Sequence, residues 1–249
     1  MSIRISEVYK AFGSKVVLDG VSLDVEDGET VAVIGFSGSG KSVLLKTIIG
    51  LLEPDSGAVF VDDEEVGSLQ GEALHELRRR MGYVFQYAAL FDSMTVEENV
   101  AMGLRRVPGM SEAAIRERVA ESLRMVDLEG FGPRYPAEVS GGQRKRVGLA
   151  RAIATRPKYL LYDEPTAGLD PVTTAVIDRL MLKMDEELGV TSIVVTHDMT
   201  SAFRVADRIA MLWEGRIRFV GTPDEARTTD DAVVRAFIDG RPELMQEVA

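Results

Sequence analysis

The segment Val31–Gly50 reads VAVIGFSGSGKSVLLKTIIG and gives the strongest indication of the fold. Its first four residues form a continuous apolar, mostly β-branched run, which is typical of a strand buried on both faces. The next eight, Gly35–Ser42, read Gly-x-x-x-x-Gly-Lys-Ser. After them, a helical spacing predicts one apolar face made of Leu44, Leu45, Ile48, Ile49 and Leu52. Strand, glycine-rich loop and helix in this order predict a loop that binds phosphate groups.

The residue types of this loop fit that chemistry. Gly35, Gly38 and Gly40 leave room for phosphate oxygens near the backbone, and the helix N-terminus attracts an anion. Lys41 is placed to reach the β- and γ-phosphates, and the Ser42 hydroxyl to bind Mg²⁺. The alternative, a glycine-rich turn that binds nothing, is disfavoured by the flanking strand and helix. The predicted nucleotide contacts are Gly35, Phe36, Ser37, Gly38, Ser39, Gly40, Lys41 and Ser42.

Length and composition limit the class of protein. A chain of 249 residues with 45% hydrophobic and 28% charged residues is typical of a globular protein with a real core. No apolar run reaches the length of a bilayer-spanning helix, and the N-terminus lacks the pattern of a signal peptide, so we expect a cytoplasmic protein. The absence of cysteine excludes disulfides and thiolate metal sites. A net charge of −11 argues against nucleic acid as a partner.

Apolar patterns and turn signals predict an alternation of strands and helices along the chain. The expected strands are 3–25 (an antiparallel group), 31–34, 58–61, 80–85, 158–163, 191–196, 209–213 and 216–220. The expected helices are 69–80, those starting at 95 and 111, 140–154, 172–188, 198–206 and 224–238. This order predicts an α/β fold with a mostly parallel sheet core, an antiparallel β subdomain and an inserted helical subdomain. We expect one domain over 1–238, with its core at 1–86 and 158–238, the helical part at about 87–157, and a tail at 239–249.

Polar residues follow several of the predicted core strands. Because ligands bind at the carboxyl ends of parallel strands, these residues are expected to join the phosphate loop. Asp163 would hold Mg²⁺, together with Ser42 and Gln86, and Glu164 would orient or deprotonate the attacking water. His197 would contact the γ-phosphate. That each residue only ends a strand is a fair alternative for one of them, and a weak one for the whole set beside a phosphate loop.

A further motif, Val139-Ser140-Gly141-Gly142-Gln143, resembles the signature of ATP-binding-cassette (ABC) ATPases. The order of motifs in that family is matched along nearly the whole chain: 35–42, Gln86, 139–143, 159–164, 167–170 and His197. Only Val139 departs from the pattern, since leucine is commonest there. The resemblance implies a P-loop NTPase of ABC type that hydrolyses ATP with Mg²⁺.

The resemblance also assigns residues that the pattern alone leaves open. Position alone favours Phe12 as a core residue, whereas the resemblance implies that it stacks on adenine. The family implies a dimer of two copies around two ATP molecules, each site using the phosphate loop of one copy and the signature of the other. A helix that begins after Ser140 would offer N–H groups to a phosphate. The implied contacts from the second copy are Ser140, Gly141, Gly142, Gln143 and Asp170.

Within the family, the chain is most similar to the Mla-type branch of phospholipid and toluene-tolerance transport ATPases. The similarity rests on Leu90–Val100, Val195–Met199 and Ala206–Leu212. It implies transport of phospholipid between membranes and an integral membrane permease as partner. A periplasmic lipid-binding subunit is a further partner that this branch allows. The ATPase would then lie at the cytoplasmic face of the inner membrane, held there by the permease.

Other functions remain open at this point. Polar amino-acid importer ATPases share parts of the same segments. A soluble ABC protein acting on ribosomes or in DNA repair is disfavoured, because such proteins generally carry two cassettes or a long coiled-coil insertion. A module that holds ATP without turnover is disfavoured by the intact Lys41, Glu164 and His197. The sequence leaves the cargo and the direction of transport undecided.

Overall fold

The computed structural model describes residues 2–241 and residue 243. The chain forms two compact units. The first unit comprises Met1–Leu74 and Thr191–Ala249, and the second unit comprises His75–Val190. Of the predicted tail at 239–249, residues 242 and 244–249 lie outside the described residues. The predicted limits of the helical part, 87 and 157, stay a prediction.

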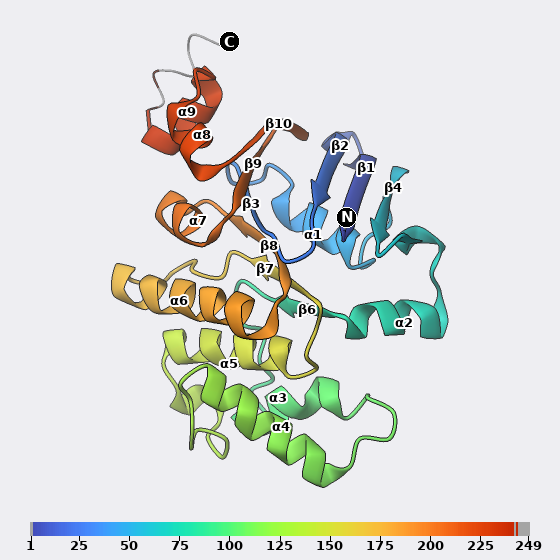
Figure 1. Ribbon diagram of the computed structural model, residues 1–249, viewed down its shortest axis with the longest axis vertical. Helices are drawn as coiled ribbons and strands as arrows, with labels where there is room; N and C mark the ends of the chain where they lie inside the picture. Colours follow the sequence, from blue (N-terminus) through green and yellow to red (C-terminus); the bar gives the residue numbers. More distant parts are fainter. Residues whose placement is uncertain (1, 242, 244–249) are drawn as a thin grey trace. The chain divides into compact units, whose positions relative to one another are not determined.

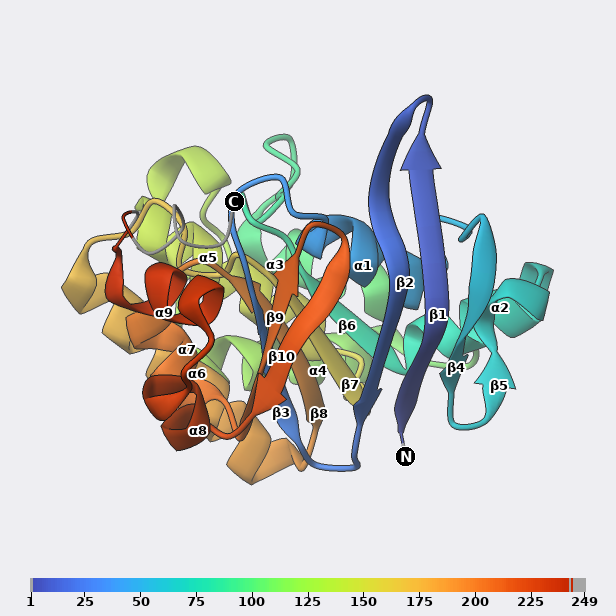
Figure 2. The same ribbon diagram turned by 90° about the horizontal axis from the view of Figure 1, so that it is seen from above.

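One sheet of the first unit is antiparallel, as predicted for residues 3–25. Strand β1 (Ile3–Phe12) pairs with β2 (Lys15–Val25) on one side and with β4 (Ser56–Val61) on the other. Figure 2 shows β1 and β2 as a long hairpin. A two-residue strand, β5 (Glu64–Glu65), extends the sheet from β4.

The parallel strands of the first unit centre on β3 (Thr30–Ile34), whose five residues are all buried. It is parallel to β8 (Thr191–Thr196) on one side and to β9 (Arg208–Trp213) on the other. Strand β10 (Arg216–Gly221) returns antiparallel to β9. The predicted buried strand before the glycine-rich loop is therefore confirmed, and the loop begins where β3 ends.

The helices of the first unit correct two expectations. Helix α1 (Lys41–Ile48) ends before Leu52, because Gly50 turns the chain with a φ of 67°. The helix expected at 224–238 is divided into α8 (Pro223–Thr228) and α9 (Ala232–Asp239). Thr229 is extended between them, and the Asp231 carboxylate begins α9 by accepting hydrogen bonds from the N–H groups of its first turn.

Helices α7 (Met199–Val205), α8 and α9 share an apolar cluster with buried residues of β3 and β9, and Figure 2 shows the three helices close together. Helix α2 (Gly71–Arg79) crosses the sequence boundary between the units. Its His75 is exposed, as the charged pattern of that segment predicts.

The second unit is mainly helical. Its strands β6 (Met81–Val84) and β7 (Tyr159–Asp163) are parallel. Figure 1 shows α5 packed between α6 and the pair α3 and α4. The bounds of these helices are α3 (Val96–Leu104), α4 (Glu112–Met125), α5 (Gly141–Ile153) and α6 (Pro171–Leu188).

The helix starts of the second unit were readable from the sequence. Thr95, Ser111 and Ser140 each accept a hydrogen bond from a backbone N–H of the first turn, as N-cap residues do. Gly189 ends α6 with a φ of 61°, the left-handed conformation that glycine adopts easily. Within the described part of the chain, the structure has no helix long and apolar enough to cross a bilayer.

Candidate active site

Two glycines of the phosphate loop are required by close backbone approach. Gly35 and Gly40 have φ values of 152° and 106°. A Cβ on Gly35 would lie 2.3 Å from the Leu212 carbonyl oxygen, and one on Gly40 would lie 2.8 Å from the Val17 carbonyl oxygen. Any side chain at these positions would displace backbone, so the loop keeps its shape only with glycine.

The loop also holds polar groups that suit an anion. Lys41 is only 6% exposed, and its ammonium donates to the carbonyls of Gly35 (2.7 Å) and Phe36 (3.1 Å). Gly40 begins α1 without a side-chain cap. The buried Ser39 hydroxyl has no hydrogen-bond partner within residues 2–241 and 243. A buried cation, an uncapped helix start and an unsatisfied hydroxyl fit a bound phosphate group.

The two aromatic candidates have different surroundings. Phe12 is 49% exposed at the end of β1, so the alternative of a core phenylalanine is wrong. The Phe36 ring instead packs edge-on against Trp213 and Phe237, at centroid distances of 5.1 and 4.8 Å. The Phe36 side chain therefore packs against other rings, and its backbone is the part that contributes to the predicted phosphate site.

The predicted metal ligand Asp163 ends β7 and is 7% exposed. The Tyr83 hydroxyl donates to its Oδ2 at 3.0 Å. Burial raises the pKa of Tyr83 far above its usual value, and the charge of Asp163 and this hydrogen bond raise it further. Tyr83 thus stays a protonated donor that fixes the orientation of the carboxylate, a role that the sequence did not indicate.

The predicted catalytic carboxylate Glu164 is 9% exposed and has a φ of 49°. This left-handed conformation is uncommon outside glycine and costs about 1–3 kcal/mol, so it persists only where the surrounding structure imposes it. One such constraint is Lys145 of α5, whose ammonium donates to the Glu164 carbonyl at 3.3 Å. His197, the other predicted contact near the γ-phosphate, directly follows β8 and is exposed.

Lys145 brings two predicted catalytic residues together. Its ammonium also donates to the Gln86 carbonyl, so one side chain holds the backbones of Gln86 and Glu164. Lys145 is only 7% exposed, and this burial lowers its pKa, although the charge of Glu164 acts in the opposite direction. The sequence predicts only a basic helix here, and the structure shows that one of its charges is internal.

Arg151, also on α5, secures the segment that follows Gln86. Its guanidinium donates to the carbonyls of Ala89 (2.6 Å) and Ala88 (2.5 Å). Both alanines have positive φ values, 60° at Ala88 and 45° at Ala89. Because this conformation is strained for alanine, the Arg151 hydrogen bonds help to maintain the turn. The sequence predicts that positions 144–151 form a basic helix, but it does not indicate which groups these side chains bind.

The signature segment begins α5 with a reciprocal capping box. The Gln143 N–H donates to the Ser140 hydroxyl at 3.2 Å, and the Ser140 N–H donates to the Gln143 side chain at 2.8 Å. A Cβ on Gly142 would lie 2.6 Å from Thr173 of α6, whereas one on Gly141 would meet nothing within 4 Å. Packing therefore explains Gly142, and the space beside Gly141 is open to a ligand or partner.

Asp170, predicted as a nucleotide contact, begins α6. Its carboxylate accepts hydrogen bonds from the Thr173 hydroxyl (2.5 Å) and from the N–H groups of Val172 and Thr173 (both 3.0 Å). These bonds, led by that of the Thr173 hydroxyl, lower the pKa of Asp170 below its usual value. Asp170 is therefore a charged helix cap at neutral pH.

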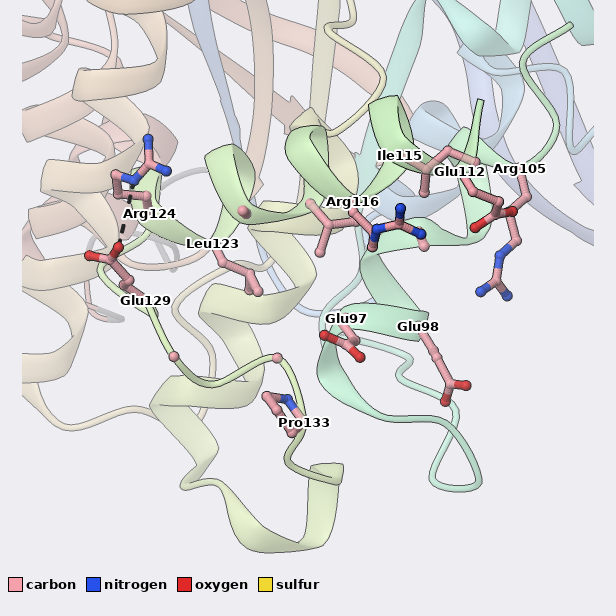
Figure 3. Close-up of a pocket in the computed structure, with 15 residues that line it drawn as sticks. Glu97, Glu98, Arg105, Glu112, Ile115, Arg116, Leu123, Arg124, Glu129 and Pro133 are labelled. Atoms are coloured by element: carbon pink, nitrogen blue, oxygen red, sulfur yellow. Dashed lines mark ion pairs between the residues drawn. The ribbon is translucent and has the colours of Figure 1, made fainter. Parts of the chain in front are cut away.

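A pocket of about 450 Å³ lies in the second unit between α3, α4 and residues 129–133 (Figure 3). Its floor is apolar, with Ile115 and Leu123, and its rim carries both acidic and basic side chains, including Arg116. The predicted catalytic and nucleotide-binding residues are not among those that line it. This pocket therefore belongs to the helical surface and is separate from the predicted chemistry.

The predicted site residues are divided between the units. The first unit contributes the phosphate loop and His197, and the second contributes Gln86, Asp163 and Glu164. Within the described residues, no group of three or more His, Cys, Asp or Glu side chains could hold a metal ion by itself. The predicted ligands, Ser42, Gln86 and Asp163, suit Mg²⁺ instead, since Mg²⁺ is usually held by one or two protein carboxylates together with water and phosphate oxygens.

A phosphate loop between a buried strand and a helix, combined with acidic residues at the end of another strand, defines a P-loop nucleoside triphosphatase. Comparison with known proteins narrows this class. The ABC transporter family profile matches residues 18–167. The chain is 46% identical over 243 residues to a sulfate/thiosulfate import ATP-binding protein of Caulobacter vibrioides, covering 96% of this chain and 69% of the relative.

Two further comparisons agree. A probable ribonucleotide transport ATP-binding protein of Mycobacterium leprae is 39% identical over 241 residues, covering 97% of this chain and 70% of the relative. A solved dimeric ATP-binding cassette, bound to ADP and Pi in a post-hydrolysis state, superposes with a TM-score of 0.81. The two share 36% identity over 89% of this chain and 98% of that one.

The chain belongs to the ABC transporter family. It has the ABC ATPase fold, as its motifs predict, and it is an ATPase that uses ATP and Mg²⁺. The relatives named above are described as sulfate/thiosulfate import and ribonucleotide transport ATP-binding proteins, and the assignment to the Mla-type branch stays a prediction.

Proposed function

We propose that this chain is the ATP-hydrolysing subunit of an ABC transporter, and that two copies close around two ATP molecules to drive a membrane permease. The observation that supports this dimer is the open start of α5, by which we mean its first-turn backbone N–H groups that have no acceptor within the helix. The capping box satisfies the N–H groups of Ser140 and Gln143, which leaves those of Gly141 and Gly142 without an intrahelical acceptor. This exposed, positive helix end suits a phosphate that a second copy presents.

Each site residue then has a defined role. Lys41 binds the β- and γ-phosphates, and Ser42, Gln86 and Asp163 hold Mg²⁺. When bound, ATP would supply the phosphoryl group that passes to water with ADP as the leaving group, and Mg²⁺ would neutralise the phosphate charge. The Glu164 carboxylate orients the attacking water and accepts its proton at an oxygen of the side chain.

Three residues complete the proposed nucleotide site. His197 contacts the γ-phosphate oxygens, and Phe12, which is exposed, stacks on the adenine. Asp170 lies at the start of α6 and contacts the nucleotide of the opposite copy. The hydrogen bonds that Lys145 and Tyr83 make hold Glu164 and Asp163 in place before the nucleotide binds.

Three exposed aromatic residues close to Gln86 in the sequence support a permease partner. The side chains of Phe85, Tyr87 and Phe91 are 37%, 84% and 49% exposed. Aromatic side chains exposed together are typical of protein interfaces, because they bury a large apolar area on binding. Since these residues flank Gln86 in the sequence, a change at the γ-phosphate can reach a bound permease through this segment. The ATPase would thus lie at the cytoplasmic face of the inner membrane.

The proposed cargo is phospholipid, with room for a periplasmic lipid-binding subunit. Support comes from the likeness of Leu90–Val100 and Val195–Met199 to the Mla-type branch. Sulfate or thiosulfate import is the second candidate, because a relative of that description is 46% identical. That relative is longer, so its activity as a whole protein does not transfer to this chain by identity alone.

Purification of the tagged chain from its native membranes in mild detergent tests the proposal. We expect a permease with bound phospholipid, identified by mass spectrometry, and loss of the permease on Tyr87→Ala with the ATPase rate of the isolated subunit maintained. A permease whose ATPase is stimulated by sulfate or an amino acid would overturn the lipid assignment. Recovery of the chain alone, under conditions that preserve membrane complexes, would overturn the transport assignment and leave the ATPase intact.

A further inference from the structure

The phosphate loop is joined to the C-terminal helix by an aromatic contact. The ring of Phe36, the second residue of the loop, lies edge-on to Phe237 of α9 at 4.8 Å, with an interplanar angle of 68°. On its other contact it lies edge-on to Trp213, the last residue of β9, at 5.1 Å and 64°. Edge-to-face pairs at these separations are attractive beyond the area they bury. We name Phe36, Trp213 and Phe237 the aromatic latch.

The latch is anchored at its C-terminal end. It packs against a cluster of fully buried residues that includes Val233 and Val234 of α9. The first turn of this helix is capped by Asp231, which also forms an ion pair with Arg218 of β10 at 2.9 Å. Arg218 binds the same carboxylate that caps the helix. Because its strand β10 pairs with β9, this ion pair fixes α9 to the sheet that contains Trp213. Phe237 is therefore presented to the loop from a rigid support.

The latch acts on the backbone that positions Lys41. The Phe36 carbonyl accepts hydrogen bonds from the Lys41 ammonium at 3.1 Å and from the Ser39 N–H at 3.2 Å. Fixing the Phe36 ring limits the rotation of its peptide group, and so fixes the acceptor that holds the lysine. Loosening the ring would let the loop sample arrangements that do not bind phosphate, and the apparent affinity would fall accordingly.

We propose that Phe237, together with Trp213, is a positioning residue for nucleotide binding: through Phe36, helix α9 holds the phosphate loop in its binding conformation. The phosphate loop motif and the C-terminal helix are separated by about 200 residues in the sequence, so no motif connects them. The proposal concerns the first unit alone and rests on the ATPase activity, whatever the cargo of the transporter.

The chain provides its own spectroscopic probe for this contact. Trp213 is its single tryptophan, so the intrinsic indole fluorescence reports on the latch alone. If a bound phosphate draws the Lys41 ammonium away from the Phe36 carbonyl, the environment of the indole changes with it. We therefore expect titration of the full chain with MgADP to change the Trp213 emission, with a midpoint equal to the Kd measured by calorimetry.

A pair of matched phenylalanine variants isolates the latch. Phe237→Ala removes the ring that touches Phe36. Phe203→Ala removes a ring of α7 that packs on the same cluster but lies under the Arg227 guanidinium at 4.2 Å. We expect Phe237→Ala to raise the Kd for MgADP about three- to tenfold, the range of one aromatic pair, and to abolish the emission change. Phe203→Ala should keep both within about twofold of the parent chain.

Folding of each variant is checked by circular dichroism and thermal unfolding without nucleotide. Phe237→Leu, which keeps an apolar side chain in the cluster, replaces the alanine variant if that one does not fold. Equal rises in Kd for the Phe237 and Phe203 variants would show a general loss of stability and overturn the proposal. An unchanged Kd for the Phe237 variant, or an emission that ignores saturating MgADP in the parent chain, would overturn it as well. Calorimetric binding to the parent chain keeps these outcomes distinct from a failure of the ATPase assignment.

Discussion

Two buried lysines, one in each unit, use the same chemistry for different ends. Lys41 and Lys145 are 6% and 7% exposed, and each ammonium donates to two backbone carbonyls. The partners of Lys41 lie five and six residues before it, in the same loop. The partners of Lys145 lie in two distant segments, at Gln86 and Glu164.

The two lysines differ in whether the ammonium group can exchange its carbonyl acceptors for a ligand. Lys41 lies in a loop with an unsatisfied hydroxyl and an uncapped helix start. A bound phosphate can therefore become a hydrogen-bond acceptor for the Lys41 ammonium. Lys145 ties separate strand ends to the signature helix, and losing its bonds would remove a charged donor from the Gln86 and Glu164 carbonyls, of which, within the described residues, only that of Glu164 is shown with another donor, the Ala167 N–H at 3.2 Å. A buried lysine thus marks a binding site in one case and a structural tie around a catalytic site in the other.

The largest expected effect falls on the residue that Lys145 holds. Glu164→Gln keeps the size of the side chain and removes the proton acceptor, so phosphate release should fall about 10²- to 10⁴-fold while ATP still binds. Glu186→Gln, an exposed change on α6, is the control and should hydrolyse at the parent rate. Hydrolysis by the Glu164 variant at the parent rate would remove this carboxylate from the chemistry.

The next effect separates binding from chemistry. Lys41→Met removes the buried charge at the phosphate loop, and loss of charge-assisted hydrogen bonds should raise the Kd for MgATP about 10- to 100-fold in calorimetry. Lys46→Met, on the same helix, should bind as the parent does. A Lys41 variant with parental affinity would contradict the assignment of this loop.

Lys145→Met should show the opposite profile. The methionine fills the space of the lysine stem, but the carbonyls of Gln86 and Glu164 lose a donor, so the free energy of unfolding should fall by about 1–3 kcal/mol. We expect kcat to fall about tenfold with the MgATP Kd within twofold of the parent, since the phosphate loop is untouched. Lys183→Met, which removes an ammonium bonded to the Met125 carbonyl, is the control for lost stability without lost turnover.

The smallest effect is expected at Tyr83. Tyr83→Phe removes the hydrogen bond to Asp163 and should cost about 1 kcal/mol of stability and a few-fold in kcat. Because the pKa of Tyr83 is raised, the hydroxyl keeps its proton between about pH 6 and 9, and the ratio of parent to variant rates should be constant there. A ratio that changes through this range would mean that Tyr83 titrates during turnover.

The sequence predicts those parts of the site whose chemistry is local. The phosphate loop, the caps at Thr95 and Ser140, and the strand before Gly35 each depend on neighbouring residues, and their types and spacing carry the information. Phe12 shows the limit of position alone, which favoured a core residue where the structure has an exposed ring.

The remaining features depend on contacts between distant segments. The Lys145 hydrogen bonds and the edge-on contact of Phe36 with Phe237 join residues separated by 19 to 201 positions, so only the folded chain reveals them. The break between α8 and α9 had a local signal in Asp231, a good N-cap residue, but the apolar spacing continued across it. Where an N-cap residue competes with a continuous apolar spacing, tertiary packing decides whether the helix breaks.

The N-terminal end of α5 is the proposed binding site for the ATP of a second copy. This assignment is tested most directly by the mass of the Glu164→Gln chain in light scattering, with MgATP and with MgADP. We expect twice the chain mass with MgATP and a single chain with MgADP, and loss of the MgATP dimer on the further change Gly141→Trp, which fills the open space beside this helix. A single chain at saturating MgATP, or a dimer that persists in the Gly141 variant, would contradict it.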